Sequence, residues 1–271
     1  MSFDGKVGFI GAGKMGASII EGLAQGGLLA AESISIYDVD SGRTAELNAK
    51  LKVKTTGSLE DLVNQADIVF VCVKPDQFSG IAGAIKSAWP ARKPTIVSIM
   101  AGVKTSRIKE LIGPETPVIR VMPNVACLIR KGATGVSADK SAPDAANKFV
   151  YDLFEFLGGA VMVAEEKLDA VTALSGSGPA YVFMFIEALT DAGVKFGLDR
   201  ASAKKLAVKT VAGAALMAEQ TDADTLELRA RVSSPGGTTV AATSKLETGG
   251  FRGIVIDAVE AAYRRSVELG K

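Results

Sequence analysis

Along the first half of the chain, short apolar runs alternate with stretches in which apolar residues recur at helical spacing. Every residue of 68–73 is hydrophobic, which is typical of a strand buried on both faces of a sheet. Strands are expected at 6–10, 34–37, 68–73, 95–100 and 117–121, and helices at 17–26, 44–50 and 59–65. Strands that alternate with helices predict a parallel, doubly wound sheet, an α/β domain over residues 1–164.

Beyond about residue 164 the pattern becomes helical and predicts no strand. Ala207, Val211, Ala214 and Ala218 fall on one stripe of an alanine-rich stretch. Small residues on a stripe allow two helices to approach closely, as in a helical bundle or a helical dimer interface. An all-α second domain over residues 165–271 is therefore predicted. Its helices are expected at 167–174, 178–196, 201–220, 222–230, 238–247 and 253–269.

The length and charge of the chain narrow the class of protein. Its 271 residues suit two domains of about 150 residues each. Lys and Arg total 31 against 30 Asp and Glu, a net charge of +1, and no basic block gives the electrostatic footprint of a nucleic-acid-binding protein. No apolar run approaches the roughly 18 residues of a membrane span, and the N-terminus lacks the apolar core of a signal peptide. We expect a cytoplasmic protein that binds neither nucleic acid nor membrane.

The chain contains no histidine. This absence excludes a Ser-His-Asp triad, a Cys-His pair, a histidine general acid and a histidine-ligated zinc. Cys72 and Cys127 form neither a CxxC pair nor a metal cluster, and are expected to be core thiols in a reducing compartment. No metal site is predicted, and any enzymatic chemistry must proceed without imidazole.

A GxGxxG turn follows the first predicted strand and precedes the first predicted helix. In this context Gly11 permits the tight turn, Gly13 lets the backbone approach a pyrophosphate, and Gly16 lets helix and strand pack closely. Lys14 and Met15 complete the turn at the helix N-terminus, which faces the anion. The turn indicates a Rossmann domain that binds a nicotinamide dinucleotide. A glycine turn without a ligand, or a site for a flavin or another nucleotide, is the alternative.

Two charged residues after the second predicted strand bear on the choice between NADH and NADPH. Asp38 stands 22 residues after Gly16, where an acid usually binds the ribose diol of NAD. Arg43, five residues further on, is placed to meet the 2′-phosphate of NADP, although a solvated charge at a helix start explains it equally well. The sequence leaves the preference between NADH and NADPH open.

Three further segments follow predicted strands and fall at the carboxyl edge of the sheet, where open α/β sheets bind ligands. They are Lys74-Pro75, Ala101-Gly102 and Asn124. The small residues Ala101 and Gly102 would let a nicotinamide ring lie close to the backbone, and Asn124 is a candidate partner for a carboxamide or a substrate. Ordinary loop chemistry, and a turn-forming Pro-Asn pair at Asn124, are the simpler explanations for each segment alone.

Two serine- and glycine-rich segments of the second half have the composition of helix starts. In 174–181, Ser177 is predicted as an N-cap, with Pro179 in the first turn. In 232–239 a glycine turn feeds a helix whose free amides and hydroxyls suit a small anion, either a carboxylate or a phosphate. A capped loop without a ligand is the alternative for this second segment.

Taken together, these segments resemble the delta-1-pyrroline-5-carboxylate reductase family, which catalyses the last step of proline biosynthesis. The resemblance covers essentially the whole chain, and its specific parts are 175–181 and 233–247, with a Gly-Gly-x-Thr core at 236–239. It implies hydride transfer from NADH or NADPH to the C=N bond of 1-pyrroline-5-carboxylate, giving L-proline. It also implies a Rossmann domain and a helical domain that interlocks with a second subunit, in a homodimer or a larger assembly of dimers.

The resemblance also assigns roles to single residues. Ser234, Gly237 and Thr238 would hold the substrate carboxylate, mainly through backbone amides, and Thr239 would hydrogen-bond the ring nitrogen as the catalytic residue. The coenzyme would be bound at the sheet edge by Gly11, Gly13, Lys14, Met15, Gly16, Asp38, Lys74, Pro75, Ala101, Gly102 and Asn124.

Two departures from the family and two rival functions stay open. Many members carry a His-Pro pair where this chain has Asp224-Thr225, a change expected to alter a helix start, and Asp38 is unusual for members that use NADPH.

One rival function is that of another Rossmann reductase, acting on imines, 3-hydroxyacids or ketoacids, with Lys195, Lys204 or Lys205 as proton donor. The other is a non-catalytic dinucleotide sensor, whereas the glycine turn argues against a pyridoxal-phosphate-binding regulator.

Overall fold

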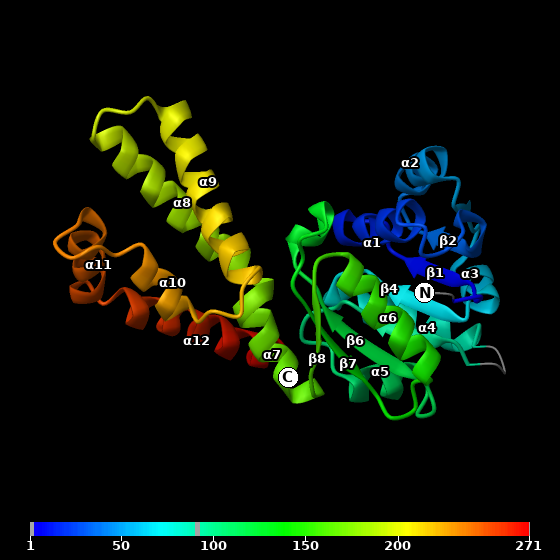
Figure 1. Ribbon diagram of the computed structural model, residues 1–271. Coiled ribbons are helices and arrows are strands. Elements are labelled where there is room, and N and C mark those ends of the chain that lie inside the picture. Colours follow the sequence, from blue (N-terminus) through cyan, green and yellow to red (C-terminus); the bar gives the residue numbers. More distant parts are fainter. Residues whose placement is uncertain (1–2, 90–92, 271) are drawn as a thin grey trace. The chain divides into compact units, whose positions relative to one another are not determined.

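The structure, a computed structural model, describes residues 3–89 and 93–270 and divides into two compact units (Figure 1). The first unit comprises the residues up to Ser177 together with those from Ala262 onward, and the second comprises Gly178–Ala261. The domain boundary predicted near residue 164 marks a change of sequence pattern. The compact unit extends beyond that point because the segment 165–177 hydrogen-bonds to the sheet unit.

The sheet of the first unit has eight strands in the order β3-β2-β1-β4-β5-β6-β7-β8. Neighbouring strands are parallel from β3 to β6, whereas β7 is antiparallel to β6 and parallel to β8. The predicted α/β class is confirmed, and each of the five expected strands is present. The strands are β1 Val7–Ile10, β2 Ile34–Tyr37, β3 Lys54–Thr55, β4 Ile68–Val71, β5 Thr95–Ser98, β6 Val118–Met122, β7 Thr134–Ala138 and β8 Ala160–Met162.

Three strands are not apparent in the apolar pattern. β3 consists of two exposed residues, and β8 is only three residues long. β7 is largely buried, but it is built from small and polar residues that give no apolar run. It becomes a strand through its pairing with β6, so the wholly parallel sheet expected from the sequence acquires an antiparallel end.

Helices cover both faces of the sheet (Figure 1). Residues of one strand alternate between two core clusters: Phe70 belongs to the first, and its neighbours Val69 and Val71 belong to the second. Phe9 stacks on Phe70 with ring centroids 4.7 Å apart. Burial on both faces therefore explains the continuous apolar runs. The first face is covered by α1 Lys14–Gln25, α2 Ser41–Leu51 and α6 Asp144–Phe156, and the second by α3 Leu59–Gln65, α4 Pro75–Ser87 and α5 Thr105–Ile112.

Both cysteines are free thiols of the first unit. Cys127 is buried and Cys72 is half-buried at the end of β4. Burial raises the pKa of both thiols. A thiol with a raised pKa is a poor nucleophile at neutral pH, because the thiolate is the reactive form.

The helix predicted at 178–196 is present as α8, but the N-cap role predicted for Ser177 is wrong, because the chain is already helical there. α7 Leu168–Val171, the π-helical turn η4 Thr172–Gly176 and α8 Gly178–Lys195 follow one another closely along the chain. Ser177 has helical dihedrals, φ −84° and ψ −20°, and its N–H donates to the carbonyl of Thr172 at 2.8 Å. Its side chain therefore does not cap a helix N-terminus.

The remaining helices agree with the predicted positions to within a few residues. They are α9 Arg200–Glu219, α10 Thr225–Arg231, α11 Thr238–Thr248 and α12 Phe251–Leu269. The short 3-10 helices η1 Ala31–Ser33, η2 Val125–Ile129 and η3 Glu165–Lys167 are not among the predicted elements. Within the described residues, no helix combines the length and the apolar character needed to cross a membrane.

The second unit buries few residues. Between residues 178 and 261 the buried ones are Thr190, Ala203 and Ala207. α8 and α9 approach closely at Gly193, where a Cβ would lie 2.9 Å from the Cβ of Ala203. Farther along the predicted small-residue stripe, Ala214 is exposed. One chain therefore covers only part of this stripe.

A partly buried ion pair joins the sheet to the segment that follows β8. Arg120 lies within β6 with 8% of its side chain exposed, and its Nη1 donates to Oε1 of Glu165 at 2.9 Å. The same oxygen accepts the N–H of Thr105, the first residue of α5, at 2.7 Å. Burial raises the pKa of Glu165, but the bonds from Thr105 and Arg120 outweigh it and bring the pKa below its usual value. The carboxylate of Glu165 thus links its own segment after β8 to β6 and to the start of α5.

The lowered pKa of Glu165 fixes the direction of a pH effect. Its stabilisation is fully present above the unfolded-state pKa of about 4.3, and is lost as the pH falls through the lower folded-state value. We expect Glu165→Gln to reduce the free energy of unfolding at neutral pH by about 1–3 kcal/mol, because Arg120 stays buried without its counter-charge. The difference from the unmodified chain should shrink in acid.

Urea unfolding at one protein concentration, at neutral pH and at about pH 3, measures this difference. Glu110→Gln is the matched control, because Glu110 forms an exposed ion pair with Arg107. Its loss should stay below about 1 kcal/mol. An equal loss for Glu165→Gln at both pH values would contradict the assignment.

Candidate functional site

The carboxyl ends of β1, β2, β4, β5 and β6 meet at one edge of the sheet, because these strands are parallel. The chain passes from β1 to β2 on one side, whereas β4 lies against β1 on the other. The loops that follow β1 and β4 therefore diverge, and such a switch point opens a crevice in doubly wound folds. The glycine turn lies at this crevice.

The three glycines of the turn have three different environments. Gly11 has φ +100°, a left-handed conformation that favours glycine. A Cβ on Gly16 would lie 2.3 Å from the carbonyl oxygen of Gly11, so the first turn of α1 packs closer than a side chain allows. At Gly13, in contrast, a Cβ would meet nothing within 4 Å. Gly11 and Gly16 thus serve the fold, and Gly13 leaves an open cradle at the N-terminus of α1.

A pocket of about 430 Å³ lies beside this cradle. Four of the predicted coenzyme residues line it: Gly11, Gly13, Asp38 and Lys74. Sequence reasoning missed Gln77, whose Oε1 accepts the N–H of Lys74 at 3.2 Å. A Gln three residues after a helix N-cap is the signal of a capping box, and it was available in the sequence. The remaining lining residues are Ile10, Tyr37, Val39, Asp40, Arg43, Cys72, Val73 and Ile81.

The carboxylate of Asp38 is engaged by the backbone. Oδ2 accepts the N–H of Ala12 at 2.7 Å, and Oδ1 accepts the N–H of Asp40 at 2.9 Å. Its side chain is 7% exposed. Arg43 is about half exposed and pairs with Asp40 at 3.3 Å and with Asp38 at 3.9 Å. The acid braces the glycine turn, whereas the guanidinium stays at the pocket rim.

Two predicted residues line a different groove, of about 660 Å³: Pro75 and Gly102. Gly102 has φ +76°, and a Cβ on it would lie 3.2 Å from the carbonyl oxygen of Leu269. The close neighbour of Gly102 in this structure is therefore the C-terminal end of α12. A coenzyme role for Pro75 and Gly102 stays a prediction.

The other predicted residues of the sheet edge lie outside both cavities. Lys14 and Met15 form the first turn of α1, and Ala101 is half-buried after β5. Asn124 is buried, and its Nδ2 donates to the carbonyl of Ser175 at 3.0 Å. The structure thus groups part of the predicted set around one pocket and spreads the rest along the edge.

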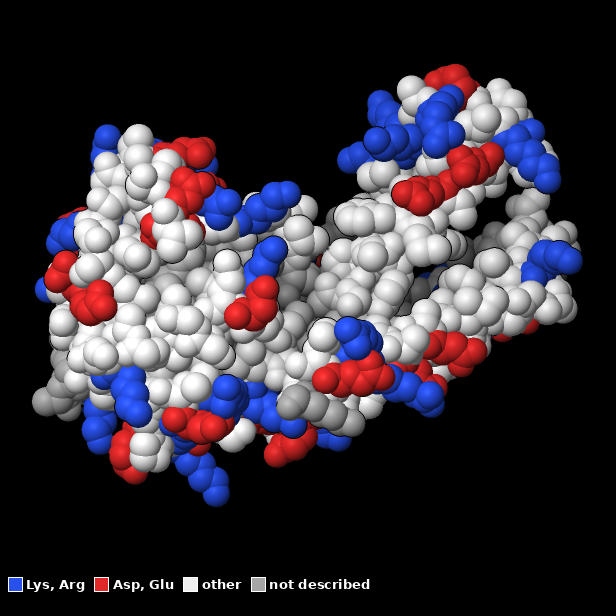
Figure 2. Space-filling model, turned by 180° about the vertical axis from the view of Figure 1, so that it is seen from behind, with Lys and Arg blue, Asp and Glu red and all other residues white. Residues whose placement is uncertain are grey.

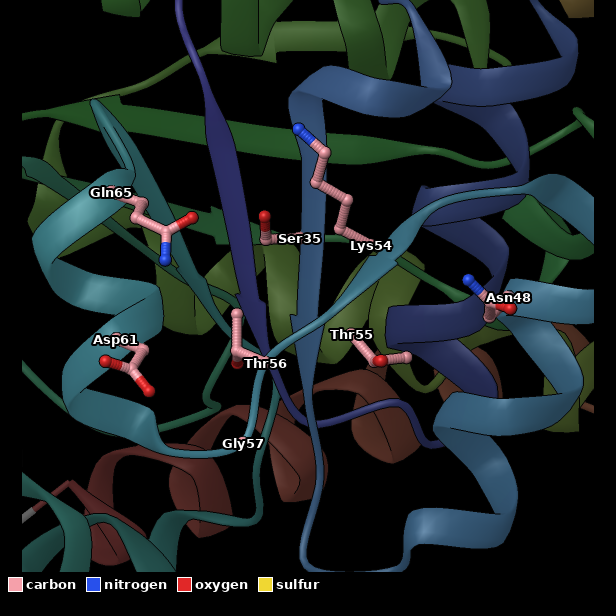
Figure 3. Close-up of a pocket in the computed structure, with 8 residues that line it drawn as sticks. All are labelled: Ser35, Asn48, Lys54, Thr55, Thr56, Gly57, Asp61 and Gln65. Carbon is pink, nitrogen blue, oxygen red and sulfur yellow. The ribbon is translucent and has the colours of Figure 1, made fainter.

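A further concavity of about 430 Å³ lies at the outer edge of the sheet beside β3 (Figure 3). Figure 3 shows Lys54 and Asp61 in separate parts of the groove, with their charged ends apart. None of the predicted site residues lines it. It lacks a glycine turn and a free helix N-terminus, so size alone does not identify a site. Among the described residues, no group of Cys, Asp and Glu is placed to hold a metal ion.

The second glycine turn, in the helical unit, ends at the N-terminus of α11. Gly237 donates to the carbonyl of Ser234 at 2.9 Å, and Gly236 has φ +68°. No side chain caps α11, so its first amides have no helical partner. Thr239 is half-buried, and its hydroxyl makes no hydrogen bond within the described chain. The turn therefore offers free N–H groups and one free hydroxyl.

Comparisons with known proteins agree over the whole chain. The family model for pyrroline-5-carboxylate reductase dimerisation matches residues 165–269, and the model for coenzyme F420-dependent NADP oxidoreductase matches residues 6–102. A pyrroline-5-carboxylate reductase of Methanosarcina acetivorans is 40% identical over 98% of both chains, and that of Pseudomonas aeruginosa is 39% identical over 98% of this chain and 97% of its own. The chain belongs to the pyrroline-5-carboxylate reductase family.

Solved structures agree with this membership. The pyrroline-5-carboxylate reductase of Coxiella burnetii has a TM-score of 0.95 at 33% identity, and covers 99% of this chain and 100% of its own. That of Plasmodium falciparum, solved with NADP bound, has a TM-score of 0.87 at 32% identity and covers 99% of both chains.

The departure from the family at Asp224-Thr225 affects a helix start, as expected. Asp224 is the N-cap of α10, and its Oδ1 accepts the N–H of Leu226 at 2.7 Å. Carboxylates are among the best N-caps, so in this chain Asp224 caps the start of α10 with its side chain.

The glycine environments predict a contrast in stability. Gly16→Ala should lower the free energy of unfolding by about 1–3 kcal/mol, because the added methyl meets a backbone oxygen that cannot move aside. Gly13→Ser should change it by less than about 0.5 kcal/mol, because the space is open and serine is a good N-cap. Denaturant unfolding of the two variants measures both values. Equal losses would mean that both positions are packed.

Proposed function

We propose that the chain reduces the C=N bond of 1-pyrroline-5-carboxylate to L-proline with NADH or NADPH. One combination of features supports the proposal: a dinucleotide turn with an open glycine, and a helix start with free amides and an unbonded threonine hydroxyl, on a chain of this family. The first suits a pyrophosphate, and the second suits a small carboxylate with a neighbouring nitrogen.

The coenzyme site is proposed to be the pocket at the glycine turn. Gly13 lets the pyrophosphate approach the N-terminus of α1, where free amides and the helix dipole attract anions. Lys74 lies on the pocket wall and adds a positive charge. The bound coenzyme supplies a hydride, and the protein fixes its position relative to the substrate.

The substrate site is proposed to be the turn before α11. The carboxylate of the substrate accepts hydrogen bonds from the free backbone N–H groups at the start of α11, beginning with Thr238, with Gly237 and the hydroxyl of Ser234 beside them. Thr239 bonds the ring nitrogen through its hydroxyl. Anchoring two points of a small ring leaves the imine carbon in one orientation, which is a substantial part of the catalytic effect.

The proton balance suits a chain without histidine. A cyclic imine takes its proton from water, and the resulting iminium carbon is already electrophilic. Hydride addition then gives the neutral amine ring without a strong general acid. Reduction of a keto group would instead require a donor for the new hydroxyl. This difference favours an imine over a keto acid as substrate.

Turnover and a threonine substitution test the proposal. Purified protein should oxidise NADH or NADPH only when pyrroline-5-carboxylate is present. Thr239→Ala should lower kcat/KM by about 10- to 100-fold, the loss expected for a hydrogen bond to a charged group. Thr243→Ala is the matched control, since Thr243 lies one turn further along α11 and its hydroxyl bonds the carbonyl of Thr239.

The rival functions give different results in the same assay. Activity on 3-hydroxyacids or ketoacids without activity on the imine would support the rival reductase. Coenzyme binding with no turnover of any of these substrates would support the sensor. Either outcome would overturn the proposed reaction.

Coenzyme choice depends on the pocket rim. Both oxygens of Asp38 bind backbone N–H groups, so the acid serves the turn, and we propose that Arg43 meets a 2′-phosphate. Arg43→Gln should weaken NADPH binding about tenfold, equivalent to 1.4 kcal/mol, and leave NADH binding unchanged. Gly13→Ser is the comparison, because it should weaken both coenzymes alike. Fluorescence titration measures the four dissociation constants. If Arg43→Gln weakened the binding of NADPH and NADH equally, Arg43 would not be the residue that recognises the 2′-phosphate.

A homodimer is proposed because the second unit leaves large apolar side chains uncovered. Met184, Ile254 and Ile256 are 69%, 64% and 65% exposed. Figure 2 shows broad uncharged areas on the helical unit, with Lys and Arg (blue) and Asp and Glu (red) interspersed elsewhere on the same face. Exposed apolar surface of this extent marks an interface, and the dimerisation model matches this region. The occupant is a second copy of the chain, and larger assemblies of dimers are compatible with it.

Sedimentation tests the dimer. Ile254→Lys together with Ile256→Lys should shift the protein towards monomer and reduce turnover, because two charges would be buried without partners. Ile129→Lys is the matched control, since Ile129 is 73% exposed but belongs to the first unit, outside the coenzyme pocket. A double variant that sediments as the unmodified protein would place the interface elsewhere.

A further inference from the structure

The helix that begins at Leu168 is irregular at one turn. Ser177 donates its N–H to the carbonyl of Thr172, five residues back, at 2.8 Å, whereas an α-helix bonds four residues back. A single π-turn inside a helix is rare and is frequent at functional sites. This turn comprises Thr172–Gly176, and its last two residues begin one of the segments that carry the family resemblance.

Pro179 explains the irregularity. It lies four residues after Ser175, lacks the N–H that an α-helix would give to the Ser175 carbonyl, and its ring would clash with that carbonyl. The π-turn relieves the clash, and the carbonyl of Ser175 is left without its α-helical donor. A freed carbonyl of this kind needs another donor when it is removed from water.

Asn124 supplies that donor. Its Nδ2 reaches the carbonyl of Ser175 at 3.0 Å. Its Oδ1 accepts the N–H of Ala126 at 3.1 Å and the N–H of Ala133 at 3.3 Å. Asn124 is 8% exposed. Both acceptor positions of Oδ1 and one of the two N–H donors of Nδ2 are therefore used by the main chain, and these three bonds fix the plane of the amide.

The π-turn also packs closely against the sheet. A Cβ on Gly176 would lie 2.7 Å from Cε of Met122, at the end of β6. A Cβ on Gly135, in β7, would lie 2.9 Å from Cγ1 of Val171. Glycine on either side of the contact thus lets the turn lie directly on the carboxyl edge of the sheet.

We propose that Asn124 is a positioning residue for the reaction proposed above, and not a coenzyme ligand. It holds the π-turn on the end of β6 through the Ser175 carbonyl, at the same carboxyl edge of the sheet as the coenzyme pocket. The expected effect on catalysis rests on the proposed function. The structural role rests on Asn124 supplying the hydrogen bond that Pro179 cannot give to the Ser175 carbonyl.

Asn124→Asp tests the role, because it keeps the acceptor for Ala126 and Ala133 but replaces the donor that faces Ser175. We expect kcat for the imine to fall about tenfold or more, the coenzyme dissociation constant to stay within about twofold, and hydrogen exchange at the Ser177 amide to quicken. Asn147→Asp is the matched control, since Nδ2 of Asn147 bonds the carbonyl of Ala142 in another part of the unit.

Pro179→Ala provides the rescue. It restores an N–H four residues after Ser175, so the loss caused by Asn124→Asp should be smaller in the Pro179→Ala background than alone. If Asn124→Asp does not fold, Gly176→Val displaces the turn with Asn124 intact, and should lower kcat while coenzyme binding is kept.

Two results would overturn the inference. The first is a coenzyme dissociation constant raised about tenfold by Asn124→Asp with exchange at Ser177 unchanged, which would make Asn124 a ligand. The second is an equal loss in both Pro179 backgrounds, which would separate Asn124 from Pro179. If the unmodified protein fails to reduce the imine, the proposed function fails alone, because coenzyme binding and hydrogen exchange still report on Asn124.

Discussion

The approach of α1 to the end of β1 is the contact on which the dinucleotide unit depends. A Cβ on Gly16 would lie 2.3 Å from the carbonyl of Gly11, so only glycine permits this closeness. The contact holds the N-terminus of α1 at the switch point of the sheet, and the space that a Cβ on Gly13 would occupy, between these two glycines, stays open. Asp38 braces the same turn from β2 through the N–H of Ala12. An anion site made of backbone N–H groups needs such rigidity, because its donors cannot adjust their positions as side chains do.

The two units of the chain differ in how they bury apolar surface. In the first, two clusters fill both faces of the sheet, and burial on this scale stabilises a unit by itself. In the second, large apolar side chains such as Met184 and Ile256 stay exposed. A helical unit with so few buried residues lacks the core that would hold it, which is why we assign its exposed helices to a second copy. The stability of this unit, and the substrate binding that we propose for its glycine turn, are then linked to association.

Chemistry without histidine is consistent with the kinds of group present at the two glycine turns. Both present backbone N–H groups at a helix N-terminus, and the cationic and hydroxyl side chains beside them include Lys14, Lys74, Arg43, Ser234 and Thr239. Such groups bind and orient anions, but they do not exchange protons readily near neutral pH. A reaction that needs orientation more than proton transfer suits them, and hydride addition to an iminium ion is such a reaction.

Much of the fold and part of the site follow from the sequence alone. Continuous apolar runs identified β1, β2, β4, β5 and β6, because strands buried on both faces leave a signal that depends only on local composition. The roles of Gly11, Gly13 and Gly16 were also predictable, since each follows from the geometry of one turn. β7 left no such signal, because its residues are small and polar and it becomes a strand only by pairing with β6.

Only the tertiary structure decided how Asp38, Gly102, Asn124 and Ser177 are used. Asp38 and Asn124 each have polar groups that suit a ligand, but each also bonds a main-chain atom far away in the sequence. Gly102 approaches the end of α12, and Ser177 continues a helix that local composition places as a start. Local pattern determines which residues can form a strand, a turn or a bond. Which of several equally suitable partners a polar group takes depends on the atoms that the fold brings within about 3 Å, and a sequence does not contain those distances.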